Sequence, residues 1–260
     1  MKKAMNIDDI EQRIYFHNRK KLAEEKRLKK CLDTANRIPK LFGGPSIYFH
    51  HRALLERERG FLETKHLEMI YAVLPSWGMH RMGTTAKAKV CSFDDFQNSI
   101  MSEDVRKIID ELKIIDDDLR KIKSIESRNE ATIHKIDRNV ISNVAAIIPK
   151  IKASISESPL VAASKTLCHI LPHIVPPIDR QYSLRFMKKN KNINRDVERL
   201  AEIFIAGMVD FFKSNSWKES LKNIVLVEPK IPVCEEYGAF NTSLPKIYDN
   251  LIVAYFRKSS

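Results

Sequence analysis

Glycine and long apolar runs are both scarce in this chain. Only seven of its 260 residues are glycine, which argues against a glycine-rich sandwich and against an α/β fold that holds nucleotides on Gly-rich loops. No apolar run approaches the roughly 20 residues needed to cross a membrane. The first nine residues contain no apolar core of a secretory signal, so we expect a cytoplasmic protein.

Cysteine is sparse as well, and the four cysteines lie far apart in the sequence. No two of them have the spacing of a zinc site, and no cluster is typical of an iron–sulfur centre. Each stands in an ordinary context, which is typical of reduced thiols in a cytosolic protein. We therefore expect no metal and no other cofactor. The four positions are Cys31, Cys91, Cys168 and Cys234.

Helix-forming residues dominate the composition. Hydrophobic residues make up 43% of the chain, and few stretches alternate with the period of a strand. The predicted class is mainly α, and the length suffices for a core without cross-links. We expect a long basic N-terminal helical segment over 1–42, a helical lobe over 43–153, and a hairpin-containing helical lobe with a C-terminal extension over 154–260.

Apolar periodicity and capping residues predict the individual helices. Ser92 and Ser102 are expected to cap helices, and the acidic triad 116–118 is expected at a helix start. Residues 172–177 are expected to be extended, because proline restricts both itself and its predecessor. One strand is an option at 224–227. The expected helices cover 7–38, 46–58, 62–73, 138–152, 160–171, 179–188, 193–212 and 245–257.

The charge is strongly positive. The chain carries 45 Lys+Arg against 33 Asp+Glu, a net charge of +12. Such a field favours polyanions such as DNA, RNA or acidic lipid; the alternative is a lysine-rich composition that serves solubility. Basic clusters at 19–21 and 26–30 form either a phosphate-facing stripe or a solvated helix face. The acidic segment 103–137 is expected to lie away from any phosphate backbone.

The first candidate segment follows Gly43 and Gly44. Two glycines before a helix N-terminus offer backbone N–H groups to an anion, and three ring-bearing residues follow at Tyr48, Phe49 and His50. The neighbouring histidine at 51 points to another side of the helix, so the pair is not expected to chelate one metal. The alternative interpretation is a helix start with buried aromatic residues.

The second candidate segment is the loop that begins at Trp77. Its indole is suited to stacking on a base, while His80 and Arg81 are suited to a base edge or a phosphate. Lys87 and Lys89 follow on the same loop. The alternative is a loop whose Trp and Met side chains plug into the core.

The third candidate segment pairs a lysine with a carboxylate. Lys165 lies in a predicted helix and Asp179 begins the next one, 14 residues later, across a proline-rich turn. That arrangement can face both side chains into one cleft. The alternative is ordinary helix capping by Asp179 and a solvated Lys165.

This third segment resembles the core of the helix-hairpin-helix DNA glycosylase superfamily. The resemblance is carried by the strings 164–167 (Ser-Lys-Thr-Leu) and 175–180 (Val-Pro-Pro-Ile-Asp-Arg), and it covers about residues 158–187. Ala162 and Ala163 stand at or near the glycines of that superfamily's hairpin. The strings 77–83 and 176–180 also resemble a group of prokaryotic proteins, a likeness that adds no mechanism.

The resemblance implies roles for individual residues. Asp179 corresponds to the aspartate that supports bond cleavage, and Lys165 to the lysine that attacks the sugar C1′ in bifunctional members. Arg180 is a cationic neighbour able to lower the pKa of that lysine. A flipped base would lie between aromatic residues, for which the candidates are Tyr48, Phe49, Trp77 and Tyr182. His80 or Arg81 would read its edge.

The sequence thus predicts a DNA glycosylase that flips a damaged or modified base out of double-stranded DNA. It would also cleave abasic sites if Lys165 is the nucleophile. The alternatives are a non-catalytic nucleic-acid-binding protein on the same helical fold and an interaction protein whose basic N-terminal helix recruits an acidic partner. The base recognised, the choice of DNA or RNA and the oligomeric state stay open.

Overall fold

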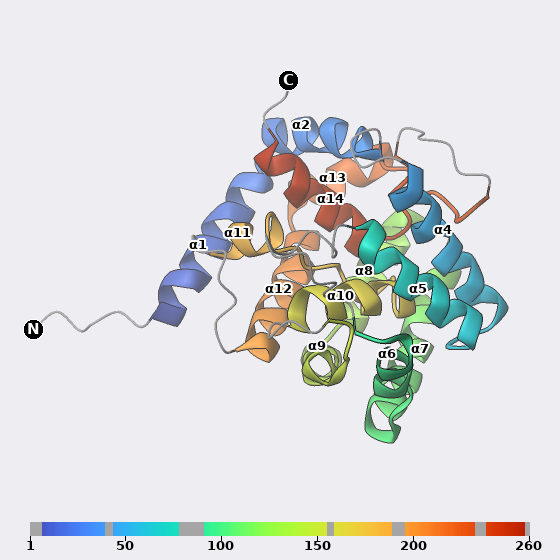
Figure 1. Ribbon diagram of the computed structural model, residues 1–260. Helices are drawn as coiled ribbons and strands as arrows, with labels where there is room; N and C mark the ends of the chain where they lie inside the picture. Colours follow the sequence, from blue (N-terminus) through green and yellow to red (C-terminus); the bar gives the residue numbers. More distant parts are fainter. Residues whose placement is uncertain are drawn as a thin grey trace, which may run out of the picture.

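The computed structural model describes residues 7–39, 44–77, 91–154, 159–188, 196–231 and 238–257. The side chains of residues 7–11 are outside that description. Within these ranges the protein is helical and contains no strand, which confirms the mainly α class (Figure 1). The helix-hairpin-helix glycosylase fold itself stays a prediction. No helix in these ranges is long and apolar enough to cross a membrane.

The helices lie close to the positions that the capping and proline signals predict. The prediction of one or two helices over 7–38 resolves into two helices, and the last helix begins at Leu244. The N-terminal half contains α1 (Ile7–Leu22), α2 (Glu25–Asn36), α4 (Gly44–Arg59), α5 (Thr64–Ser76), α6 (Phe93–Met101), α7 (Glu103–Lys121) and α8 (Ile125–Lys135). The C-terminal half contains α9 (Arg138–Ile147), η2 (Ile148–Lys150), α10 (Pro159–Ile170), α11 (Ser183–Met187), α12 (Val197–Phe212), α13 (Asn215–Ser220), η3 (Leu221–Asn223) and α14 (Leu244–Phe256).

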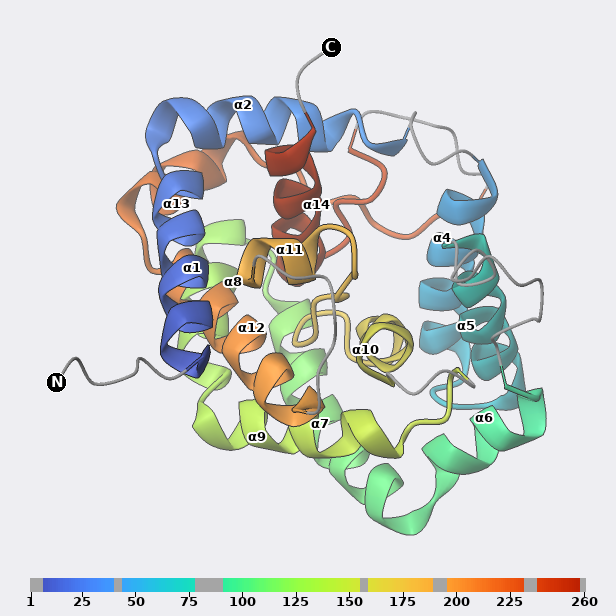
Figure 2. The ribbon, with the colours of Figure 1, turned by 60° about the vertical axis from the view of Figure 1, so that its left-hand side comes forward.

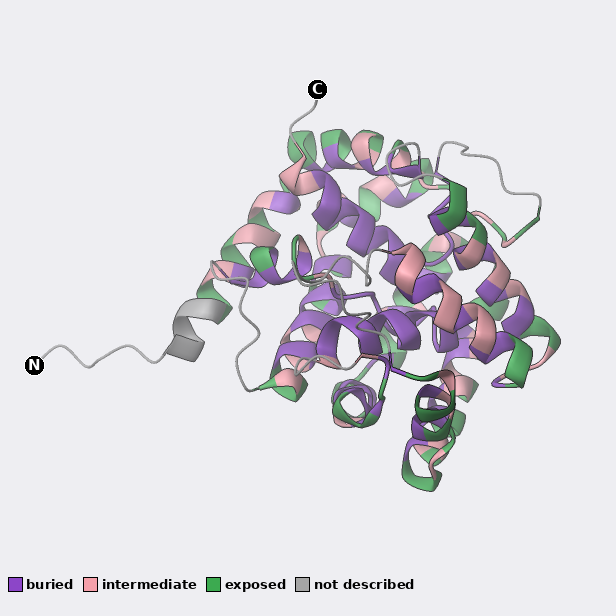
Figure 3. Cartoon of the chain, in the orientation of Figure 1, coloured by how far each residue is buried: buried purple, intermediate pink, exposed green. Residues whose placement is uncertain are grey.

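Helix α10 lies at the centre of the molecule, inside a ring of the other helices (Figure 2). Every residue from Leu160 to Ile170 is buried (Figure 3). It contacts α4, α5, α12 and η2, and small residues such as Ala162 and Ala163 allow this close approach. The expectation that these two alanines stand at the hairpin turn was wrong, because both lie inside the helix and are fully buried.

The hydrophobic core is one cluster that draws on all three segments predicted from the sequence. Its largest part is an aromatic group in which the Trp217 ring stacks on Phe212, 5.2 Å between centroids. The Trp217 N–H donates to the side-chain oxygen of Asn129 at 2.8 Å, so the buried indole has its partner. Tyr248 of α14 packs against the same group.

Four local predictions were wrong. Residues 172–177 are not extended throughout, because 172–174 form a turn in which the backbone N–H of Ile174 donates to the backbone oxygen of Leu171 at 3.1 Å. The acidic triad does not begin a helix: Asp116 lies within α7, where it is fully buried and accepts a hydrogen bond from Arg57 at 2.7 Å. Residues 224–227 are extended but pair with no strand in the described ranges. The helix after Asp179 is short, from Ser183 to Met187, because a turn occupies 180–182.

Two predicted caps had different outcomes. The Ser92 hydroxyl accepts the backbone N–H of Asp95 at 3.1 Å, which confirms a side-chain cap. Ser102 precedes α7 but makes no side-chain cap; its hydroxyl donates to the backbone oxygen of Ser99 instead. Helix boundaries are therefore well encoded locally, whereas the hydrogen bonds at each boundary also depend on the neighbouring turn.

Candidate functional site

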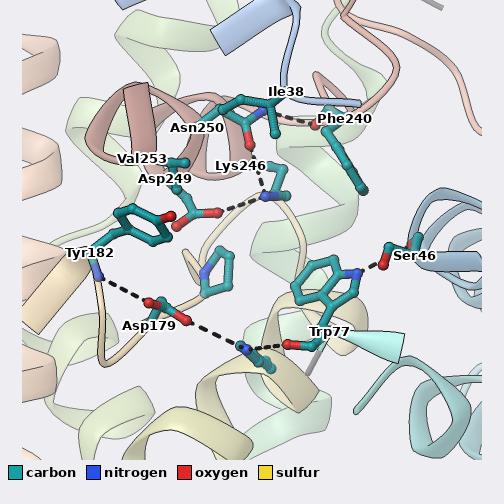
Figure 4. Close-up of a pocket in the computed structure, with 12 residues that line it drawn as sticks. Ile38, Ser46, Trp77, Asp179, Tyr182, Phe240, Lys246, Asp249, Asn250 and Val253 are labelled. Carbon is teal, nitrogen blue, oxygen red and sulfur yellow. Dashed lines mark hydrogen bonds and ion pairs between the residues drawn. The ribbon is translucent and has the colours of Figure 1, made fainter. Parts of the chain in front are cut away.

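A cavity of about 80 Å³ lies where Ile38, the start of α4, the end of α5, α10, α14 and the 177–182 turn meet. It brings together parts of the chain that are far apart in sequence. Figure 4 shows aromatic, basic and acidic side chains facing this space. The residues used below are Trp77, Lys165, Asp179, Tyr182, Lys246 and Asp249.

The structure brings Lys165 and Asp179 together, as the spacing predicted. Lys165 Nζ lies 3.8 Å from Asp179 Oδ2, with 6% of the lysine side chain and 29% of the aspartate side chain exposed. The ammonium also donates to the backbone oxygen of Trp77 at 3.3 Å. The expectation of a solvated lysine is thereby excluded, and the amine of Lys165 is held inside the cavity.

The turn that carries Asp179 is fixed to α10 by hydrogen bonds. The Ser164 hydroxyl accepts the backbone N–H of Ile178 at 2.9 Å. Asp179 Oδ1 accepts the backbone N–H groups of Gln181 at 2.6 Å and Tyr182 at 3.0 Å. Its second oxygen, Oδ2, is left to face Lys165. The carboxylate therefore both shapes the turn and presents one oxygen to the cavity.

Trp77 forms one wall of the cavity. Its indole N–H donates to the backbone oxygen of Ser46 at 3.2 Å, which fixes the ring at the end of α5. Two ammonium groups lie near the ring, Lys165 Nζ at 5.9 Å and Lys246 Nζ at 5.1 Å from its centroid. These distances are within the range of cation–π attraction, so the indole helps to hold both cations in the cavity.

The sequence analysis missed three polar residues of α14. Lys246 Nζ donates to Asp249 Oδ2 at 2.6 Å and to the side-chain oxygen of Asn250 at 2.9 Å, and all three residues are buried. Their spacing of three and four places them on one face of a helix. Polar residues at that spacing in an otherwise apolar helix were the signal that could have identified them.

The electrostatics of the cavity combine two lysines with two aspartates. Burial raises the pKa of the Asp249 carboxyl, the nearby Lys246 lowers it, and the negative charge of Asp179 raises it. The two ion pairs are thus coupled across the cavity. A group that develops positive or negative charge inside it would meet a partner of opposite sign.

A pair of buried histidines stands behind Trp77. His169 Nδ1 lies 2.8 Å from the backbone oxygen of Lys165, which only accepts, so this nitrogen carries the proton. His169 Nε2 then accepts from His50 Nδ1 at 2.9 Å, and His50 Nε2 accepts from the Thr242 hydroxyl at 2.9 Å. Burial lowers the pKa of both rings, to about 4 for His169. The rings are therefore neutral and form a fixed support.

The aromatic residues of the 43–52 segment do not line the cavity. Tyr48 is exposed and Phe49 is partly buried, and the two rings pack edge to face. His50 is buried behind Trp77, where it serves the support just described. None of these three residues lines the cavity, so a base held there would not contact them, and a part for Tyr48, Phe49 and His50 in nucleic-acid binding stays a prediction.

The other predicted site residues divide into two groups. Tyr182 lines the cavity, and Arg180 is exposed beside it on the turn. Arg257 donates to the Tyr182 hydroxyl at 3.3 Å, and Arg185 is exposed on α11, so the edge of the site is basic. Outside the described residues lie His80, Arg81, Lys87 and Lys89.

In the described part of the chain, no three His, Cys, Asp or Glu side chains lie close enough together to hold a metal ion.

Comparison with protein-family models, with curated proteins and with solved structures gave no match. The residues of the cavity are thus the basis for a functional proposal.

Proposed function

We propose that this protein is a DNA glycosylase that excises a flipped, damaged or modified base at the cavity of Trp77, Lys165 and Asp179. The observation that carries the proposal is the approach of Lys165 Nζ to 3.8 Å from Asp179 Oδ2 in a mostly buried setting. Base excision uses an amine nucleophile, a fixed carboxylate and an aromatic surface for the base. The net charge of +12 supports a polyanionic substrate.

The proposed step is a displacement at the sugar. The Lys165 ammonium first releases a proton to water, and the neutral amine then attacks C1′, so that an N–C1′ bond forms while the glycosidic bond breaks. The base leaves with the bonding electron pair and takes up a proton from water. Asp179 stabilises the positive charge that builds on the sugar and accepts the proton released by the amine. Opening of the sugar then gives the Schiff base that borohydride reduces.

The cavity is too small to admit a base unless the structure changes on binding. At about 80 Å³ it is roughly half the ~150 Å³ of a cavity that holds benzene. A base would enter only if side chains at the opening separate. Tyr182 is partly buried there, and its movement is the change we expect on binding.

The deciding experiment is borohydride trapping on duplex DNA that contains an abasic site. The unchanged protein should give a covalent adduct, and Lys165→Gln should lose it. Lys213→Gln is the matched control, because Lys213 is an exposed lysine that follows α12 and pairs with Asp210. Thermal melting of each variant checks that the fold is retained.

A second lysine makes the trapping test sharper. Lys246 shares the cavity, so Lys246→Gln is compared with Lys165→Gln. Loss of the adduct only in Lys246→Gln would refute the role of Lys165. Asp179→Asn should slow base release from a panel of modified-base duplexes by about a hundredfold or more, the usual effect of removing one electrostatic stabiliser.

A non-catalytic nucleic-acid-binding protein is the second candidate. The contacts of Asp179 and Lys165 favour this candidate, because both residues have structural roles. Asp179 Oδ1 accepts hydrogen bonds that hold the turn, and Lys165 donates to the backbone oxygen of Trp77. This candidate predicts nucleic-acid binding that weakens steeply with salt, no adduct, and no base release from any substrate.

A further inference from the structure

We infer that a second, larger cavity binds the phosphate group of a nucleotide-sized phosphate monoester. This cavity has a volume of about 520 Å³ and lies among α4, α7, α8, residues 172–173 and the extended segment 226–229. Its lining residues differ from those of the cavity at Lys165 and Asp179. The inference therefore does not depend on the proposed glycosylase activity.

The charge of the cavity wall is unbalanced. Of the described residues that line it, five are basic and two are acidic, Glu58 and Glu228. Three of the basic residues already have carboxylate partners, because Arg57 pairs with Asp116 and Asp117, Arg120 with Glu58, and Lys121 with Asp118. Lys123 and Arg128 are the lining cations without an ion pair among the described residues. An anion is the ligand that such a wall attracts. The basic residues are Arg57, Arg120, Lys121, Lys123 and Arg128.

Arg128 and Arg57 have different partners. Arg128 donates only to backbone oxygens, those of Arg120 at 3.1 Å and Ile122 at 3.0 and 2.6 Å. These partners orient its guanidinium, which has no ion pair among the described residues; the negative charge of Glu228 at the same cavity wall acts on it through space. Arg57 is saturated by contrast, since its donors meet carboxylates that include Asp116 at 2.7 Å. Arg128 is therefore the cation best placed to receive an anion.

His173 adds a buried imidazole to the cavity wall. The residue lines the cavity and is 6% exposed, and its Nδ1 is covered by protein and has no hydrogen-bond partner among the described residues. Burial and the charges of Arg128, Arg57 and Arg120 lower its pKa to about 3, so the ring is neutral. A turn of the ring toward the cavity on binding would let this nitrogen donate its N–H to a phosphate oxygen, which removes the cost of an unpartnered buried group.

The other residues of the cavity wall indicate which class of anion would bind. Guanidinium groups match the geometry of phosphate oxygens, and the apolar side chains of Leu54, Pro172 and Leu226 also line the cavity. Cations beside an apolar surface suit a phosphate attached to an apolar or planar body. The volume is within the roughly 300–1,000 Å³ typical of small-molecule sites. The phosphate could belong to a free nucleotide or to the 5′ end of an oligonucleotide.

The test is titration calorimetry of the full chain with five probes. They are inorganic phosphate, AMP, adenosine, and a trinucleotide with and without a 5′-phosphate. AMP should bind, and adenosine should not. Binding of the phosphorylated trinucleotide but not of its 5′-hydroxyl form would assign the site to nucleic-acid ends, whereas binding of AMP alone would assign it to free nucleotides.

Variants locate the site. Lys123→Gln and Arg128→Gln should each weaken AMP binding about tenfold or more, as expected when one charge-assisted contact to a phosphate is removed. Lys135→Gln is the matched control, because Lys135 is an exposed lysine at the end of α8 that pairs with Asp118. Arg128 also donates hydrogen bonds to the backbone oxygens of Arg120 and Ile122. If Arg128→Gln does not fold for that reason, Lys123→Gln still tests the site.

Two results would overturn the inference: no heat with AMP or phosphate, or equal affinity in Lys123→Gln and the unchanged protein. Asp179→Asn separates this site from the proposed function. It should retain AMP affinity even where base release is lost. If it lost both, the binding would belong to the first cavity and the inference would fail.

Discussion

Replacement of Gly207 by alanine should destabilise the protein, although alanine is the better helix former. Gly207 lies inside α12, and a methyl group there would overlap the ring of Tyr15. The Tyr15 ring cannot move aside without losing its hydrogen bonds. It is buried, its hydroxyl donates to the backbone oxygen of Phe204 at 3.0 Å, and it shares a second hydrogen bond with the Tyr248 hydroxyl at 2.9 Å.

The magnitude follows from opposing contributions. Alanine in place of glycine in a helix interior gains about 1 kcal/mol. Overpacking a dense core costs about 1–3 kcal/mol, and displacing the Tyr15 hydroxyl leaves buried polar partners unsatisfied at about 1–3 kcal/mol. The net expectation for Gly207→Ala is a loss of about 1–5 kcal/mol in the free energy of unfolding, measured by urea denaturation.

Gly60→Ala is the matched control. A methyl group at residue 60 would meet only the flexible, exposed side chain of Glu63, so the stability should change little. Tyr15→Leu removes the ring itself, and adding Gly207→Ala to it should cost much less than Gly207→Ala alone. Equal or greater stability of Gly207→Ala would refute the argument, as would the same cost in both backgrounds.

Three further predictions concern buried polar groups. Trp217→Phe should lose about 1–3 kcal/mol in urea denaturation, because it leaves the side-chain oxygen of Asn129 without its donor; no change would show that another donor replaces it. Arg57→Met should lose about 3–5 kcal/mol, because it leaves the buried Asp116 carboxylate unpaired, and Arg57→Met with Asp116→Leu should recover most of the loss in the same assay. The free energy of unfolding should fall from pH 7 to pH 5, because buried histidines with lowered pKa values take up protons only when the protein unfolds. Each histidine whose pKa is about 3 to 4 in the folded protein should lower the free energy of unfolding by about 2 kcal/mol at pH 5. Asp116, whose pKa burial raises to about 7, acts in the opposite direction and offsets about one of them. A flat stability profile between these pH values would contradict the assignment of neutral rings to His50, His66, His169 and His173.

Part of the candidate site could be predicted from the sequence. The proline-rich turn between Lys165 and Asp179 is a local feature, and its stiffness limits where the two side chains can go. Their spacing and residue types therefore predicted a meeting that the structure shows at 3.8 Å. Their chemical roles stay predictions, because the same contacts also serve the turn.

Other parts of the site were beyond local signals. Trp77 and Lys165 are 88 residues apart and touch through a backbone oxygen. Lys246 and Asp249 enter the cavity from the last helix; their spacing in an apolar helix indicates a shared polar face but not which cavity that face lines. The same holds for the large basic cavity, where Arg128 and His173 come from different elements.

By itself the sequence determined the mainly helical class and the approximate position of most helices. Capping residues, prolines and apolar periodicity act within a few neighbouring residues, so they can be read without the fold. Only the tertiary structure decided which polar residues are buried. A lysine such as Lys165 becomes buried when helices distant in sequence pack around it, and the cost of that burial is offset only by partners that the same packing supplies.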